Sequence, residues 1–191
     1  MRTVLLYIIL TITLSGLAYD ACAQEVGVPH KLQISLFCKA LTFDRNLETR
    51  CGEELVICIL FQGRYRASHD AMKEVYKATR DAEIDRVKGL PLRLVNVDLE
   101  DKNWAQKVAE QSADVVYLMP VRSIEISDVK KYARERHLLT LCADPSNLAD
   151  GITLGLRLND NRPKFVINLS ESRSEGADFS SQLLGLAEVI E

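Results

Sequence analysis

The residues that could perform catalysis are few and scattered in this sequence. His69 and His137 have no Asp, Cys or Ser at a spacing that would indicate a catalytic triad. The sequence contains no G-x-S-x-G elbow, no Walker loop and no dinucleotide fingerprint. The acidic clusters at 53–54 and 98–101 lack the ligand spacing of a calcium loop, and the cysteines lack that of a zinc site. We therefore expect a protein without enzymatic activity, metal or cofactor.

One segment combines residue types suited to binding an anion. The loop GRYRASH, residues 63–69, follows an apolar run and brings Arg64, Arg66 and Ser68 to the start of a predicted helix. In open α/β sheets, ligands bind at the carboxyl ends of the parallel strands, where helix N-termini point. Two guanidinium groups at that place can hold a carboxylate or a phosphate. The alternative is a solvated turn in which Ser68 caps the helix.

The elements that would position this loop alternate between strands and helices. Apolar runs of strand length, bounded by polar turns, indicate strands that are covered on both faces. The predicted strands are 54–61, 92–97, 114–119 and 138–143, and the predicted helices are 31–47, 68–85, 102–111 and 121–136. This alternation predicts a three-layer α/β fold, in which a mostly parallel sheet carries helices on both faces.

The pattern changes near the end of the chain. Residues 152–158 alternate strictly between apolar and polar, and residues 164–169 form another strand of period two. The short link between them allows only an antiparallel pair, so we expect a C-terminal hairpin. The apolar residues of 179–190 then recur at helical spacing. They predict a closing C-terminal helix, capped by Asp178 or Ser180.

The first 23 residues have the features of a secretory signal peptide. Arg2 precedes an uncharged apolar run, and Ala21 and Ala23 form the A-x-A pattern of a cleavage site. A membrane anchor is the alternative, but roughly fourteen apolar residues are few for a span. The residues before Cys22 lack the small, uncharged types that lipoprotein processing prefers. We therefore expect export to the periplasm and a mature protein that does not itself span the membrane.

After cleavage, a leader at 24–30 and a single domain at 31–191 remain. The formal net charge of −3 gives no reason to expect a nucleic-acid partner. The mature chain keeps Cys38, Cys51, Cys58 and Cys142. Export permits disulfides, but the pairing of these cysteines is left open, because burial as small apolar side chains is the alternative.

The C-terminal segment carries the most specific pattern in the chain. A strand ends in Asn168 and Leu169, and Gly176 follows in a polar loop. The run F-S-S-x-L-L-x-L-A then supplies Ser180, Ser181, Leu183, Leu184 and Ala187. This order resembles the closing motif of the YfiR-like periplasmic proteins, a family often described only as a domain of unknown function. The N-terminal helix departs from that family, since KALTFDRNL replaces its usual aromatic end.

The resemblance implies a regulator that binds the periplasmic part of an inner-membrane signalling protein, a diguanylate cyclase or a sensor kinase, and restrains it. Such binding needs an exposed apolar patch, and the N-terminal helix or the hairpin edge are its expected contributors. For Asn168, Ser180 and Ser181 we expect bonds to backbone groups of the loop and the last helix, and the alternative is a polar site.

A second function class is a periplasmic solute-binding module for small anions. A doubly wound half-domain with a basic loop is similar to one lobe of a periplasmic binding protein, but it lacks the second lobe that closes over a ligand. The identity of the partner, control by a small ligand and the formation of a homodimer are left open by the sequence.

Overall fold

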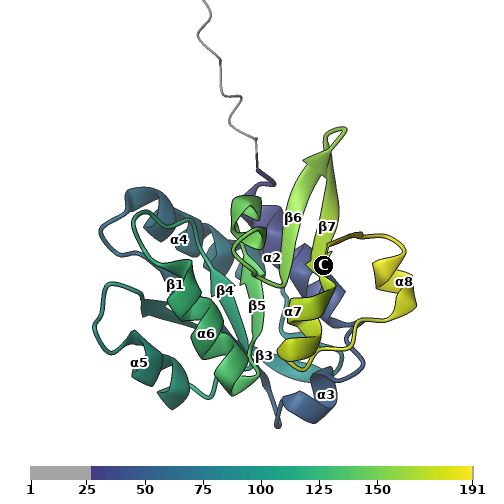
Figure 1. The fold of residues 1–191 in the computed structure, drawn as a ribbon, viewed down its shortest axis with the longest axis horizontal. Helices are drawn as coiled ribbons and strands as arrows, with labels where there is room; N and C mark the ends of the chain where they lie inside the picture. Colours follow the sequence, from purple (N-terminus) through teal and green to yellow (C-terminus); the bar gives the residue numbers. More distant parts are fainter. Residues whose placement is uncertain (1–26, 191) are drawn as a thin grey trace, which may run out of the picture.

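The computed structural model describes residues 27–190, so the predicted signal peptide and the start of the leader lie outside the described residues. The described chain folds around an eight-stranded sheet with the order β2-β3-β1-β4-β5-β6-β7-β8 (Figure 1). Its strands are β1 (Leu55–Phe61), β2 (Arg86–Val87), β3 (Leu90–Asp98), β4 (Val115–Leu118), β5 (Leu139–Cys142), β6 (Leu154–Asn159), β7 (Arg162–Asn168) and β8 (Glu188–Ile190).

The centre of the sheet is parallel because helices connect its strands. β1 pairs in parallel with β3 on one side and β4 on the other, and β5 follows β4. The helices are α2 (His30–Leu41), α3 (Leu47–Arg50), α4 (Arg66–Asp81), α5 (Trp104–Glu110), α6 (Ile126–Arg136), η1 (Pro145–Leu148), α7 (Leu169–Ser174) and α8 (Ser181–Leu184). The carboxyl ends of β1, β3 and β4 therefore meet at one edge of the sheet, and their amino ends meet at the other.

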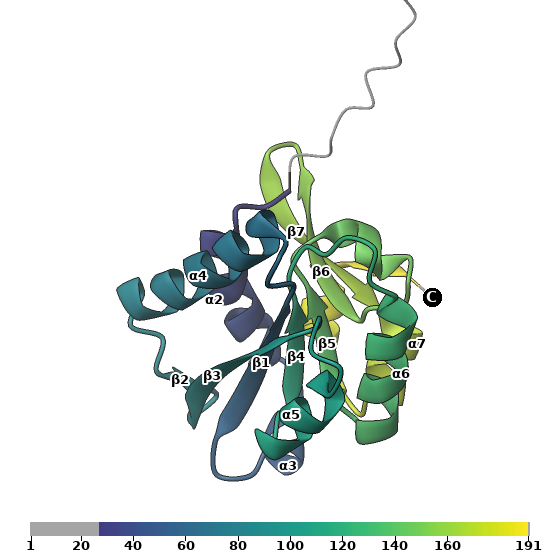
Figure 2. The same cartoon turned by 90° about the vertical axis from the view of Figure 1, so that its left-hand side faces the viewer.

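Helices cover both faces of the sheet, with α2 and α4 on one side and α5 and α6 on the other (Figure 2). Successive residues of β1 point to opposite faces and so divide between two cores. Ile57 and Ile59 pack in the core beneath α2 and α4. Cys58 and Leu60 pack in the core beneath α5 and α6. The predicted α/β fold with helices on both faces is confirmed.

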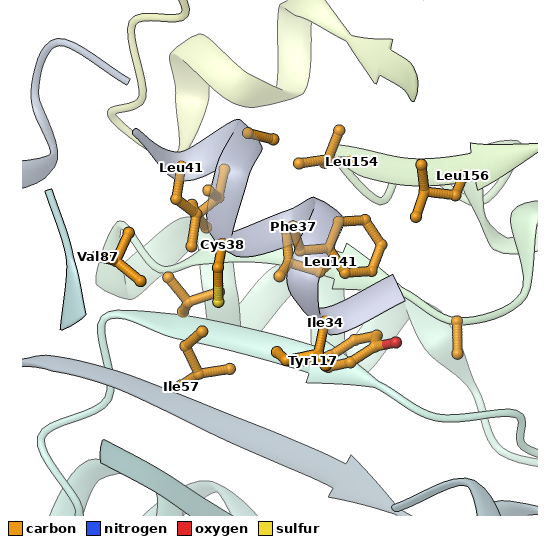
Figure 3. Packing of buried hydrophobic residues seen from close by; sticks show 14 of the residues in the cluster. Ile34, Phe37, Cys38, Leu41, Ile57, Val87, Tyr117, Leu141, Leu154 and Leu156 are labelled. Atoms are coloured by element: carbon orange, nitrogen blue, oxygen red, sulfur yellow. The ribbon is translucent and has the colours of Figure 1, made fainter. Parts of the chain in front are cut away.

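The core beneath α2 and α4 is the larger of the two, and α2 lies at its centre. Phe37 and Leu41 point from this helix toward the strands, and the ring of Phe37 meets that of Tyr117 edge-on, at 5.2 Å between centroids (Figure 3). The hydroxyl of Tyr117 donates a hydrogen bond to the side chain of Gln33, whose amide donates to the carbonyl of Ala143 at 3.0 Å. These buried polar groups are paired, which fixes the position of α2 on the sheet.

The helix predicted at 31–47 ends earlier, at Leu41, and the separate helix α3 follows. The reason lies in the turn between them, where the buried carboxylate of Asp44 accepts a hydrogen bond from the N–H of Asn46 at 3.0 Å. Such a bond offers the backbone an alternative to continued helix. The helix predicted from residue 121 likewise begins later, at Ile126.

The C-terminal hairpin is present as β6 and β7, which pair antiparallel from Leu154 and Ile167 outward. The closing helix is much shorter than the predicted 179–190, because only α8 is helical and β8 follows it. Gly185 ends α8, as expected for a residue of low helix propensity. β8 then pairs in parallel with β7. Strand pairing with β7 therefore replaces the last turns of the predicted helix. The predicted loop between the strand and that helix contains α7.

The four cysteines in the described part of the chain are free and buried. Cys38 and Cys51 lie in the larger core, and Cys58 and Cys142 lie in the smaller one. Burial raises the pKa of each thiol far above its usual value. None of the helices in residues 27–190 is long and apolar enough to cross a membrane.

Candidate functional site

The loop after β1 is tied to the carboxyl edge of the sheet by bonds within the protein. Ser68 is buried in the first turn of α4, and its hydroxyl accepts a hydrogen bond from the N–H of Gln62 at 2.9 Å. The side chain of Asp98, at the end of β3, accepts a hydrogen bond from the N–H of Gly63 at 3.1 Å. Ser68 therefore closes the loop onto β1, and it makes no capping bond to the helix.

The two arginines of this loop are exposed. The side chain of Arg66 is 94% exposed and pairs with Asp70, one turn along α4, at 3.4 Å. The N–H of Arg64 donates to the carboxylate of Glu100 at 2.9 Å. A protein carboxylate thus takes a backbone donor that the predicted anion would have used. The anion site at this loop stays a hypothesis that depends on the two guanidinium groups alone.

The structure does not bring His69 and His137 together. His69 lies at the carboxyl edge of the sheet, with its ring centroid 6.1 Å from that of Phe61. His137 follows α6 at the amino edge, in the left-handed conformation with φ of 53°. Within residues 27–190, no group of three or more His, Cys, Asp or Glu side chains could hold a metal ion.

The polar residues of the C-terminal motif lie at helix starts. Asn168 precedes α7, and its side-chain oxygen accepts a hydrogen bond from the N–H of Glu171 at 3.1 Å. Ser180 stands at the N-cap position of α8, and its buried hydroxyl has no hydrogen-bond partner among the described residues. Ser181 is exposed. The apolar motif residues are Leu169, which begins α7, and Leu183, Leu184 and Ala187, which pack in or against the larger core.

α7 is joined to α6 by an ion-paired carboxylate. Glu171 lies 2.6 Å from a guanidinium nitrogen of Arg134 and 3.0 Å from the ammonium of Lys130. Burial disfavours the charged form, but hydrogen bonds from Arg134 and Lys130 leave the pKa of Glu171 below its usual value. Lys130 and Arg134 on the basic side of α6 therefore help to hold the C-terminal segment.

A second carboxyl group in this segment is fully buried. Glu175 is 0% exposed, and its carboxylate accepts hydrogen bonds from the N–H and hydroxyl of Thr140 at 2.9 and 2.7 Å and from the hydroxyl of Thr153 at 2.6 Å. Burial raises the pKa of Glu175 to about 7, although the threonine hydrogen bonds favour the charged form. The sequence gives no local signal for this group, because its threonine partners are distant in the chain and only the following Gly176 marks a helix end.

A third buried carboxylate joins the two ends of the domain. Asp44 is 0% exposed, and it accepts hydrogen bonds from Arg50 at 2.7 Å and from the N–H groups of Asn46 and Asp178 at 3.0 and 2.9 Å. Its own carbonyl accepts from the ammonium of Lys88 at 2.9 Å. Asp44 was not predicted from the sequence either. The run Asp-Arg-Asn after an apolar helix is the turn signal that could have indicated it.

The C-terminal segment ends in two of the three large apolar side chains that are exposed in residues 27–190. Leu186 is 65% exposed and Val189 is 41% exposed, and Leu32 is the other large apolar side chain that is exposed there. β8 pairs with β7 on one side, and in the described residues its other side carries no strand. We call this surface, made of Leu186, Val189 and the open side of β8, the C-terminal edge.

The order and pairing of the strands define a doubly wound α/β domain. Structures with this fold include the ABC domain in complex with L-Trp from Streptococcus pneumoniae, at 14% identity and a TM-score of 0.60, covering 85% of this chain and 62% of that one. A conserved domain protein from Vibrio cholerae matches at 13% identity and 0.60, covering 85% and 60%. An open, ligand-free substrate-binding protein with adhesive properties from Clostridium difficile matches at 10% and 0.53, covering 76% and 57%.

This chain spans about three-fifths of the length of those proteins, so the likeness concerns the fold. A search of curated proteins found no match. The family model of the YfiR/HmsC-like proteins matches residues 41–188, which contain strands β1 to β7, the first residue of β8 and the C-terminal motif. The chain belongs to the YfiR/HmsC-like family. This is a family of periplasmic regulatory proteins, and the resemblance read from the C-terminal motif is confirmed.

Proposed function

We propose that this protein, once exported, binds the periplasmic part of an inner-membrane signalling protein, a diguanylate cyclase or a sensor kinase, and restrains its activity. The observation that carries the proposal is the C-terminal edge. Exposed apolar side chains beside an open strand are suited to a protein partner, because the strand offers backbone hydrogen bonds and the side chains offer apolar area.

The position of the edge differs from the surfaces expected from the sequence. α2 buries most of its apolar residues against the sheet and leaves Leu32 exposed. The hairpin edge is covered by β8 between Val166 and Asn168. An ion pair of 2.8 Å between Arg157 and Glu188 ties β8 to the hairpin. The partner would therefore meet β8 rather than β7.

The proposal is tested with the purified periplasmic domains of candidate inner-membrane diguanylate cyclases and sensor kinases. We expect saturable binding in calorimetry, and we expect Leu186→Asp to weaken it by about tenfold or more, because a charge is costly in an apolar contact. Leu32→Asp is the matched control, since it places the same charge on another exposed leucine. Equal binding by the wild type and Leu186→Asp, at unchanged melting temperature, would refute the role of the edge.

A second candidate function is solute binding, which the likeness to substrate-binding folds favours. The ligand would be a small anion held by Arg64 and Arg66 at the carboxyl edge of the sheet. Titration of anions into the Arg64→Ala/Arg66→Ala double variant tests this candidate, and an affinity equal to that of the wild type would remove it. The domain corresponds to part of those proteins, so we place regulation first.

A further inference from the structure

Neither of the two proposed functions involves a cavity that lies at the amino edge of the sheet. It has a volume of about 560 Å³ and lies where α3, the end of α6 and the C-terminal segment meet. Its lining is formed by Arg50, Ser112, Ala113, Asp114, Arg136, His137, Leu138 and Gly176. This is the opposite end of the parallel strands from the loop that holds Arg64 and Arg66.

The inner wall of the cavity contains an incompletely paired cation. The side chain of Arg50 is 13% exposed, and one of its terminal nitrogens donates to Asp44 at 2.7 Å. Its Nε and its other terminal nitrogen are buried without a hydrogen-bond partner among the described residues. A guanidinium group has five N–H donors, and buried donors without an acceptor are costly. Arg50 therefore keeps unused hydrogen-bonding capacity at the inner wall of the cavity.

Two further donors stand at the mouth of the cavity. Arg136 and His137 are exposed at the end of α6. The guanidinium of Arg136 lies 5.8 Å from the centre of the Tyr132 ring, which restrains this side chain at the end of α6. Arg50 inside and these two residues outside thus present three nitrogen-bearing side chains to one space. Oxygen anions are the ligands that such a set recognises.

The negative groups around the cavity weaken this attraction only in part. The ends of α5 and α6 meet here, and helix C-termini carry partial negative charge. Asp114 is the acidic residue in the lining, and its carboxylate already accepts a hydrogen bond from the N–H of Val56 at 2.8 Å. Burial raises the pKa of Asp114, against the opposing influence of that bond and of Arg50, so its charge is less favoured. Binding must therefore come from the side-chain cations.

We propose that this cavity binds a small anion through carboxylate or phosphate oxygens, with Arg50 as the inner contact and Arg136 and His137 at the mouth. The ligand would join α3 and α6 to the C-terminal segment. Gly176, the motif glycine, permits this geometry. Its φ of +85° suits glycine, and a Cβ there would lie 3.3 Å from Cδ of Arg50. The inference is independent of the signalling partner proposed above.

The experiment uses the full mature protein and two probes, inorganic phosphate and succinate, at constant ionic strength set with sodium chloride. Constant ionic strength removes general screening from the comparison. We expect at least one probe to raise the melting temperature with a saturable concentration dependence and to give a measurable Kd in calorimetry. Saturation by phosphate or by succinate supports the site and identifies the class of the ligand.

Variants at the mouth localise the binding without disturbing Asp44. Arg136→Gln removes one cation, and His137→Asn removes the imidazole while asparagine tolerates the left-handed backbone. We expect each to raise Kd about tenfold, the order expected for one lost charge-assisted contact. Arg80→Gln is the matched control, because it removes an exposed guanidinium at the end of α4.

Three results would overturn the proposal. The first is that neither probe raises the melting temperature with a saturable concentration dependence. The second is a Kd that stays the same in Arg136→Gln and His137→Asn. The third is a loss of binding in the Arg64→Ala/Arg66→Ala double variant alone, which would assign the anion to the carboxyl edge. None of these results bears on the signalling partner, whose binding is measured separately.

Discussion

Replacement of Glu175 by glutamine should change how the stability of the protein depends on pH. The carboxyl group is 0% exposed and its pKa is raised from 4.5 to about 7. Below the lower value, the group is protonated in both the folded and the unfolded chain. Between the two values, the unfolded chain releases the proton while the folded chain keeps it. The free energy of unfolding therefore falls as the pH rises through this range.

The size of the effect follows from the difference between 4.5 and about 7. At 1.36 kcal/mol per pH unit, it corresponds to about 3 kcal/mol lost between roughly pH 4 and pH 8. Glutamine has nearly the same shape and does not ionise. Its oxygen can accept the hydrogen bonds of Thr140 N–H and the Thr153 hydroxyl, and the Thr140 hydroxyl can rotate to accept from its amide. The Glu175→Gln variant should therefore lack this part of the pH dependence.

The measurement is urea unfolding of the wild type and the variant at several pH values, followed by circular dichroism. We expect the two free-energy curves to diverge with rising pH, the wild type losing about 3 kcal/mol more than Glu175→Gln. Glu53→Gln is the control, since Glu53 is exposed and lies outside this cluster. Parallel curves for the wild type and Glu175→Gln would refute the claim that folding raises the pKa of this carboxyl group.

Two other substitutions test the contacts of the C-terminal segment and the turn after α2. Asp44→Asn should lower the free energy of unfolding by about 3 kcal/mol in urea titration, because Arg50 stays buried after losing its countercharge. Arg45→Ala, which breaks only an exposed pair, should cost less than about 1 kcal/mol, and equal losses would contradict the argument. Asn168→Ala should cost about 1 kcal/mol by removing the cap of α7, and Asn168→Ser should restore most of it; identical melting temperatures for all three proteins would show that the bond to Glu171 is unimportant.

The sequence was sufficient for the parts of the fold that local periodicity encodes. The run from Leu55 to Phe61 is apolar at every position, and the structure buries it on both faces between helices. The alternation of strands and helices then determined the parallel centre of the sheet, because a crossover helix allows little else. The same order placed the loop of Arg64 and Arg66 at the carboxyl edge.

The features that depend on distant residues could not be read from the sequence. Residues 179–190 have helical spacing, but β8 forms because β7 supplies an unpaired edge beside it. The bonds between Glu175 and Thr140 join residues 35 positions apart, and no local pattern distinguishes a buried glutamate from an exposed one. The same holds for Arg50, whose incomplete pairing depends on the positions of Asp44 and Gly176.

The buried cysteines can serve as probes of local opening of the fold. A thiol-reactive reagent can attack Cys38 or Cys142 only when the surrounding layer separates from the sheet, because both side chains are shielded in the closed state. Cys38 reports on the α2 side, and Cys142 on the side of α5 and α6. The order in which a mass spectrometer finds these two sites labelled would reveal which layer of the sandwich opens first.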